Sequence, residues 1–182
     1  AQALMAVADI SAILLTTEPE IRYFSGFLTP FWQSPTRPWF MVVPATGKPV
    51  AVIPEIGRDC MTATWIDDIR TWSSPDPEDD GVSLLMEALR DAVGDGSAFG
   101  VAMGPETHLR MPLLDFEMLT RTLALDIADA TPILRQLRMV KSEAEIEKIA
   151  YICGIVSGVF EGMPGWLAAG MTEFDVFRGF RI

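Results

Sequence analysis

Short apolar runs alternate with segments of helical periodicity from residue 11 to about residue 137, and this alternation restricts the possible fold more than any other feature. Apolar runs of strand length occur at residues 11–16, 39–43, 50–53, 69–72, 99–103 and 125–128. Helical patterns occur at residues 18–24, 55–64, 82–93 and 112–122, and Thr131 is expected to cap a further short helix that starts at Pro132. A turn-rich spacer at residues 44–49 joins two of the apolar runs and indicates a β-hairpin. This order of elements predicts an α/β fold, specifically a three-layer α/β/α domain with a mixed central sheet.

A second region begins near residue 138 and has a helical pattern only. Ser142 and Glu145 have the spacing of a capping box, in which each side chain bonds to the backbone of the other residue. Apolar residues then recur every three or four positions, at Ile146, Ile149, Ile152, Cys153, Val156 and Phe160. Residues 162–165 interrupt this helix, and Thr172 begins another. We therefore predict two domains: an α/β domain at residues 1–137, and a linker with the first helices of an incomplete domain at residues 138–182.

Composition excludes two classes of partner. The formal net charge is −11, so the clustered cations needed to bind phosphates are lacking, and neither nucleic acid nor an anionic membrane surface is an expected partner. No apolar run approaches the length of a membrane span, and the N-terminus does not have the pattern of a signal peptide. Cys60 and Cys153 lie in different predicted domains within apolar helical patterns. They are expected to be buried thiols of a cytoplasmic protein.

Three short segments occur in a fixed order along the chain: IRYFSGF at residues 21–27, RMVKSEAEI at residues 138–146 and AGMTE at residues 169–173. The first resembles an element of the N-terminal domain in the creatinase/Xaa-Pro peptidase family, the M24 or "pita-bread" hydrolases. The second is similar to that family's domain junction, and the third to the turn between the first two helices of its catalytic domain. The resemblance covers almost the whole chain and implies a creatinase-like N-terminal domain followed by the start of a truncated pita-bread domain.

The resemblance implies that the chain is the N-terminal part of a metal-dependent Xaa-Pro dipeptidase or aminopeptidase that serves dimerisation and substrate gating. Family members hold two divalent metals, Mn, Co or Zn, through two Asp, one His and two Glu that lie downstream of the AGMTE turn. No catalytic residue or metal ligand is therefore expected in this chain, which alone should be inactive. The expected partners are a second copy of the chain and a peptide or small amide substrate. Two alternatives remain: a non-peptidase C–N hydrolase of the creatinase or ectoine-hydrolase type, and a purely structural dimerisation module.

The most unusual segment is the loop at residues 30–39, which has three prolines, three aromatic residues and one cation. In the family this loop points toward the active site of the neighbouring subunit. We predict that Phe31, Trp32 and Arg37 line a substrate pocket in trans, where Arg37 pairs with a substrate carboxylate. The alternative is that the aromatic residues pack the loop onto its own domain.

Other polar residues favour structural roles. The single histidine, His108, follows a turn and has no carboxylate or second histidine at helical spacing, so a surface or capping position is expected. The pairs Asp67–Asp68 and Asp79–Asp80 are expected to be solvated, because adjacent side chains on an extended backbone point apart.

Overall fold

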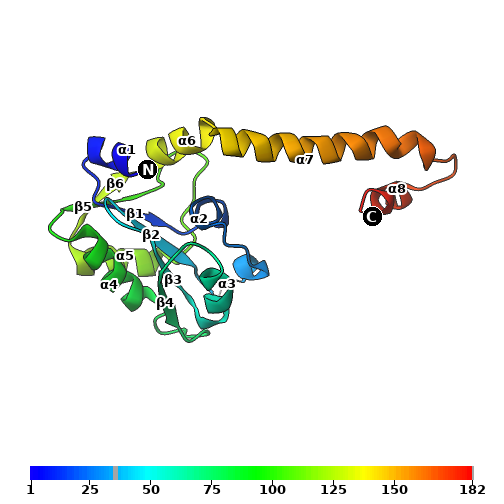
Figure 1. Ribbon diagram of the computed structural model, residues 1–182. Coiled ribbons are helices and arrows are strands. Elements are labelled where there is room, and N and C mark those ends of the chain that lie inside the picture. The colour runs from blue at the N-terminus through cyan, green and yellow to red at the C-terminus, as the bar shows by residue number, and fades with distance from the viewer. Residues whose placement is uncertain (35–36, 182) are drawn as a thin grey trace. The chain divides into compact units, whose positions relative to one another are not determined.

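The computed structural model of the chain describes residues 1–34 and 37–181. The chain divides into two compact units, Ala1–Leu137 and Arg138–Ile182, which are described separately (Figure 1).

The first unit is built on one six-stranded sheet with the strand order β4-β3-β2-β1-β5-β6 (Figure 1). Its strands are β1 (Ala12–Leu15), β2 (Phe40–Pro44), β3 (Val50–Pro54), β4 (Asp68–Trp72), β5 (Ala98–Val101) and β6 (Asp126–Asp129). The β1–β2 and β2–β3 pairs are antiparallel, and the other three pairs are parallel. Gly47 adopts a φ of 86° in the connection between β2 and β3, a conformation that glycine takes without steric cost. The predicted hairpin and the mixed sheet are confirmed.

Helices cover both faces of this sheet and give the three predicted layers. One face is covered by α1 (Gln2–Val7), α2 (Glu18–Ser25), α3 (Arg58–Thr62) and α6 (Thr131–Met139), whose buried side chains share one core cluster. The other face is covered by α4 (Val82–Val93) and α5 (Leu113–Leu123), which form a second cluster. Strand β1 supplies both clusters, because Ile13 belongs to the first and Leu14 to the second. This alternation is the period-2 pattern of a strand that is buried on both faces.

The segment at residues 55–64 differs from the single helix predicted there. It forms a short 3-10 turn, η2 (Glu55–Gly57), followed by α3. Met61 is fully buried, whereas Ile56 is 54% exposed and Cys60 is exposed. The prediction that Cys60 is buried is therefore wrong. Cys153 is exposed as well, so the prediction of two buried thiols is also wrong.

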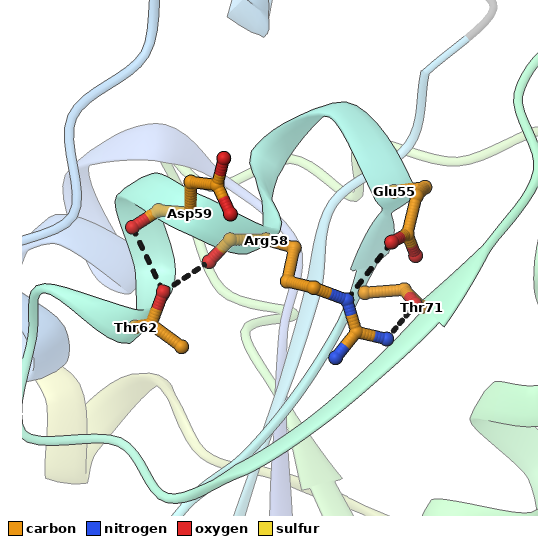
Figure 2. A network of polar contacts seen from close by, with 5 residues as sticks. All are labelled: Glu55, Arg58, Asp59, Thr62 and Thr71. Atoms are coloured by element: carbon orange, nitrogen blue, oxygen red, sulfur yellow. Dashed lines mark hydrogen bonds and ion pairs between the residues drawn. The ribbon is translucent and has the colours of Figure 1, made fainter.

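Polar contacts connect this segment to the edge strand β4 (Figure 2). The Arg58 guanidinium donates to the Glu55 carboxylate at 2.9 Å and to the Thr71 hydroxyl of β4, as Figure 2 shows. The Thr62 hydroxyl donates to the carbonyl of Arg58 one turn earlier, at 2.9 Å. The hydrogen bonds with Thr71 and Arg58 lower the pKa of Glu55. The network occupies the exposed edge of the sheet with charged side chains, which is a common protection of edge strands.

Thr131 has a different role from the predicted helix cap. Its hydroxyl accepts hydrogen bonds from the backbone N–H groups of Met103 at 2.9 Å and Gly104 at 2.8 Å. Its own N–H donates to the Asp129 carboxylate at 2.9 Å. Through these hydrogen bonds the buried Thr131 holds the turn that follows β5 against the start of α6. The two segments are distant in sequence, so a local pattern does not reveal the contact.

The second unit contains α7 (Glu143–Gly162), a 3-10 turn η3 (Met163–Gly165) and α8 (Glu173–Gly179). The predicted capping box is present: the Ser142 N–H donates to the Glu145 carboxylate at 2.8 Å, and the Ser142 hydroxyl accepts from the Glu145 N–H. Thr172 and Asp175 form a second capping box at the start of α8. No residue of α7 is buried, and Ile146 and Phe160 are 54% and 58% exposed. None of the helices in the described ranges has the length and apolar character needed to cross a membrane.

Candidate functional site

The loop that follows α2 begins with the 3-10 turn η1 (Pro30–Gln33). The Thr29 hydroxyl caps this turn by accepting the Phe31 N–H at 3.3 Å, and Pro30 occupies a first position where a missing N–H costs nothing. Pro35 and Thr36, which belong to the loop singled out in the sequence, lie outside the described residues. The loop ends at Trp39, which is fully buried directly before β2.

Three aromatic rings fix the base of this loop. Trp32, Trp39 and Phe27 are 6%, 0% and 1% exposed. The Phe27 and Trp39 ring centroids are 5.3 Å apart, and those of Trp32 and Trp39 are 5.6 Å apart. Such pairs contribute roughly 0.5–1.5 kcal/mol each beyond the burial of their area. Most of the Trp32 ring therefore packs on its own domain, which is the alternative arrangement considered for the aromatic residues.

Phe31 and Arg37 pair with each other in the loop, and Phe31 also packs against the edge of the first core cluster. The Arg37 guanidinium lies 5.3 Å from the centre of the Phe31 ring, and it donates to the Ser34 hydroxyl at 3.1 Å. Both side chains are partly exposed. The structure thus brings together two of the three predicted binding residues as a cation–π pair, while Trp32 is buried against Phe27 and Trp39.

A pocket of about 280 Å³ opens next to Trp32. Three segments that are distant in sequence form its walls: the start of α2, the turn η1, and the connection between β5 and α5. Its lining residues are Thr17, Glu18, Pro19, Trp32, Gln33, His108 and Arg110. Phe31 and Arg37 are not among the described residues that line this pocket. The pocket is large enough for a group of amino-acid size and combines an aromatic wall with charges of both signs.

Arg110 gives the pocket its cationic side. Its guanidinium lies 5.7 Å from the centre of the Trp32 ring, a cation–π geometry. Partial burial lowers the pKa of Arg110, but a guanidinium remains charged at physiological pH. The indole N–H of Trp32 is buried with no hydrogen-bond partner among the described residues. His108 is exposed at the same pocket, which agrees with the surface position expected for it.

Within the described ranges, no group of three or more His, Cys, Asp or Glu side chains is arranged to hold a metal ion. The acidic pairs have other partners: Asp67 pairs with Lys48, and Asp68 pairs with Arg70 at 3.1 Å. Asp79 accepts the Ser83 N–H at 3.0 Å at the start of α4.

Asp80 departs from the expectation of a solvated carboxylate. Its Oδ1 is buried without a hydrogen-bond partner among the described residues, and burial raises the pKa of this carboxyl group. The loop turns inward at this position, because Gly81 follows in the left-handed conformation and lies directly against the Trp72 ring.

Sequence reasoning missed Arg110. The segment at residues 104–111 lies between a predicted strand and a predicted helix and has no periodicity of its own, and Arg110 is a lone cation within it. Its importance comes from contacts with Trp32 of η1 and with Ser34 directly after it, more than seventy positions earlier in the chain. A pattern in one sequence carries no signal for such a contact.

The first unit coincides closely with a known domain. The chain matches the family model described as the creatinase/prolidase N-terminal domain over residues 1–140. The probable dipeptidase PepE of Mycobacterium tuberculosis is 27% identical over 176 residues, which make up 97% of this chain and 44% of that protein. The chain therefore spans less than half the length of the curated relatives it matches.

Solved structures show the same architecture. The crystal structure of dipeptidase PepE from Mycobacterium ulcerans matches with 27% identity and a TM-score of 0.67, covering 98% of this chain and 45% of that chain. The recombinant prolidase from Thermococcus sibiricus matches with 16% identity and a TM-score of 0.74, covering 98% and 46%. The second likeness supports the fold alone.

Proposed function

The chain belongs to the creatinase/prolidase N-terminal domain family, and on this basis we propose that it is the amino-terminal part of a metal-dependent Xaa-Pro dipeptidase or aminopeptidase. The observation that carries the proposal is the family match over residues 1–140 together with a relative named as a dipeptidase along 97% of the chain. In this reading the α/β unit takes part in dimerisation and substrate gating, and hydrolysis of the peptide bond belongs to the rest of the protein.

The domain boundary proposed here follows residue 137, so that residues 138–182 begin the pita-bread catalytic domain. The long helix α7 supports this, because its apolar side chains are exposed and a globular protein normally buries such a face. The capping boxes at Ser142 and Thr172 define the N-termini of α7 and α8 through residues of the second unit alone, which supports a separate domain. We propose that the exposed apolar side chains of α7 pack within that catalytic domain.

Two divalent metals, Mn, Co or Zn, are part of the proposal for the whole protein. The described residues offer no ligand set that fits them, so the metals are assigned to the part of the protein that this chain does not include. Metals of this kind lower the pKa of a bound water and polarise the substrate carbonyl. A cytoplasmic location is proposed from the two cysteines, which are both free and exposed.

The partly exposed face of the loop is proposed to contact substrate in the neighbouring subunit of a homodimer. Phe31 and Arg37 lie on that face as a cation–π pair, and both are partly exposed. A guanidinium forms strong, often bidentate pairs with carboxylates, and a dipeptide carries a carboxylate at one end. Arg37 is therefore assigned to the substrate carboxylate, and Phe31 to the apolar body of the substrate.

The test is steady-state kinetics of the full-length protein with Ala-Pro as substrate. Replacing Arg37 by Ala removes a charged hydrogen-bond donor worth about 1.5–3 kcal/mol, so KM should rise by roughly 10- to 100-fold. The matched control is Arg121→Ala, because Arg121 pairs with Glu117 on the surface of α5, away from the loop. Unchanged kinetics in Arg37→Ala would refute the assignment of the loop to the substrate site. Full activity of the protein after its metals have been removed would refute the assignment as a metallohydrolase.

A non-peptidase C–N hydrolase is the second candidate, because the matching family includes creatinase as well as prolidase. Including creatine and a cyclic amide in the same assay separates the two. Turnover of either one without cleavage of Ala-Pro would favour this candidate.

A further inference from the structure

Arg110 is anchored to the sheet by its backbone. Its N–H donates to the hydroxyl of Thr16 at 3.0 Å, and Thr16 is 2% exposed immediately after β1. The backbone of Arg110 therefore has a fixed position at the end of the central strand. Its side chain extends from this rigid point, so any group that the guanidinium binds is held in a fixed position relative to the core of the domain.

The guanidinium binds the loop on both sides of residues 35 and 36. One terminal nitrogen, Nη2, donates to the backbone carbonyl of Ser34 at 2.7 Å. The other, Nη1, donates to the backbone carbonyl of Arg37 at 3.2 Å. The same planar group lies 5.7 Å from the centre of the Trp32 ring. One side chain thus contacts the 3-10 turn, the residue that ends it, and the cation proposed to meet substrate.

This geometry requires arginine. A guanidinium presents several N–H donors in a rigid plane and can bind two separate carbonyls while its face covers an aromatic ring. A lysine ammonium is a compact point charge on a flexible stem, so it does not reproduce the paired contacts. Hydrogen bonds from a charged donor are also stronger than neutral ones, which makes this contact a substantial constraint on the loop.

We propose that Arg110 is a positioning residue that holds the loop in the conformation presenting Phe31 and Arg37. It acts by fixing the backbone of Arg37, and its effect on substrate passes through that residue. The effect on the loop stands on the contacts above, whereas the effect on kinetics rests on the proposed function.

The experiment compares Arg110→Lys and Arg110→Ala with the unmodified full-length protein, again with Arg121→Ala as the matched control. Hydrogen exchange is followed at the Phe31–Ser34 amides, where the Ser34 N–H bonds to the Phe31 carbonyl at 3.0 Å. Both Arg110 variants should speed this exchange by about tenfold or more, given the strength of charged hydrogen bonds. Exchange in β1 should stay unchanged, which shows that the domain is still folded.

Kinetics with Ala-Pro provide the second readout. Arg110→Ala and Arg110→Lys should raise KM about tenfold with a smaller change in kcat, as expected when a binding group is misplaced. The double variant Arg37→Ala/Arg110→Ala should be no worse than Arg37→Ala alone, because the two residues act through one contact.

Unchanged loop exchange in both Arg110 variants would overturn the proposal. Additive effects on KM in the double variant would also overturn it, because they would mean that Arg110 contacts substrate directly. If the exchange rises but Arg37→Ala has normal kinetics, the loop is clamped as proposed and the substrate role of the loop is what fails. Faster exchange with a non-additive rise in KM supports both.

Discussion

Replacing Gly57 by Ala tests whether the aromatic base of the loop is as rigid as its packing indicates. A Cβ at this position would lie 2.3 Å from Cζ3 and 2.6 Å from Cη2 of the Trp39 ring. Carbon atoms pack at about 3.5–4.0 Å, so the ring would have to retreat by about 1 Å. Gly57 has a φ of −94°, an ordinary value for alanine, so the steric contact is the main cost of the substitution.

The retreat is blocked by the neighbours of Trp39. The ring is fully buried and lies against Phe27 and Trp32, with centroids at 5.3 Å and 5.6 Å. Overpacking of a well-packed core typically costs about 1–3 kcal/mol, and we expect a value of about 2–3 kcal/mol here. For a unit of this size, that loss corresponds to a fall in Tm of roughly 10 °C.

The measurement is thermal and urea unfolding of the Gly57→Ala variant, followed by near-ultraviolet circular dichroism, which reports on tryptophan packing. Gly47→Ala is the control, because Gly47 has a φ of 86° and open space around it, so only backbone strain of about 1 kcal/mol is expected. Adding Trp39→Phe to Gly57→Ala should recover part of the loss, because the smaller ring makes room. A Gly57→Ala variant as stable as wild type, or losses that simply add in the double variant, would refute the reasoning.

Two further predictions concern the junction of β5, β6 and α6. Thr131→Val should lower the free energy of unfolding by about 1–3 kcal/mol, because the Gly104 N–H loses its acceptor and the Met103 N–H keeps only the Asp129 carboxylate at 3.2 Å. Thr131→Ser should be close to wild type in the same urea titration, and equal stability of both variants would contradict this. Hydrogen bonds with Thr131 lower the pKa of Asp129 in the folded protein. The ionised Asp129 therefore stabilises the fold above the ordinary Asp pKa near 3.9, and this contribution is lost as the pH falls through the lower pKa of the folded state. Unfolding midpoints measured below about pH 5 should therefore fall less steeply in Asp129→Asn than in wild type, and identical slopes would count against this role.

Much of the fold follows from local pattern. The predicted hairpin around residues 44–49 forms β2 and β3 in antiparallel pairing, because a short turn between two apolar runs leaves few other arrangements. The helix predicted at residues 82–93 has those bounds in the structure, since its apolar residues recur at helical spacing and Gly94 follows it. The capping box at Ser142 is likewise present, because it involves neighbours only three residues apart.

Local pattern fails where a residue's role depends on distant partners. Cys60 lies in an apolar helical pattern, yet it is exposed in α3, where Met61 is the buried residue. Thr131 was expected to cap its own helix, but its hydroxyl accepts hydrogen bonds from the end of β5. For Trp32 the sequence leaves open whether the ring faces a substrate or its own domain, and the packing against Phe27 and Trp39 depends on residues outside the turn η1.

The sequence by itself determined most of the elements, the mixed sheet and the family, because these depend on periodicity, turn residues and short motifs that neighbouring residues carry. Only the tertiary structure brings Arg110 against the loop. It also forms a pocket from the start of α2, η1 and the β5–α5 connection. The physical reason is that hydrogen bonds and ring contacts between distant segments depend on how the sheet orders its strands. These contacts join residues more than seventy positions apart, so they leave no periodic trace along the chain.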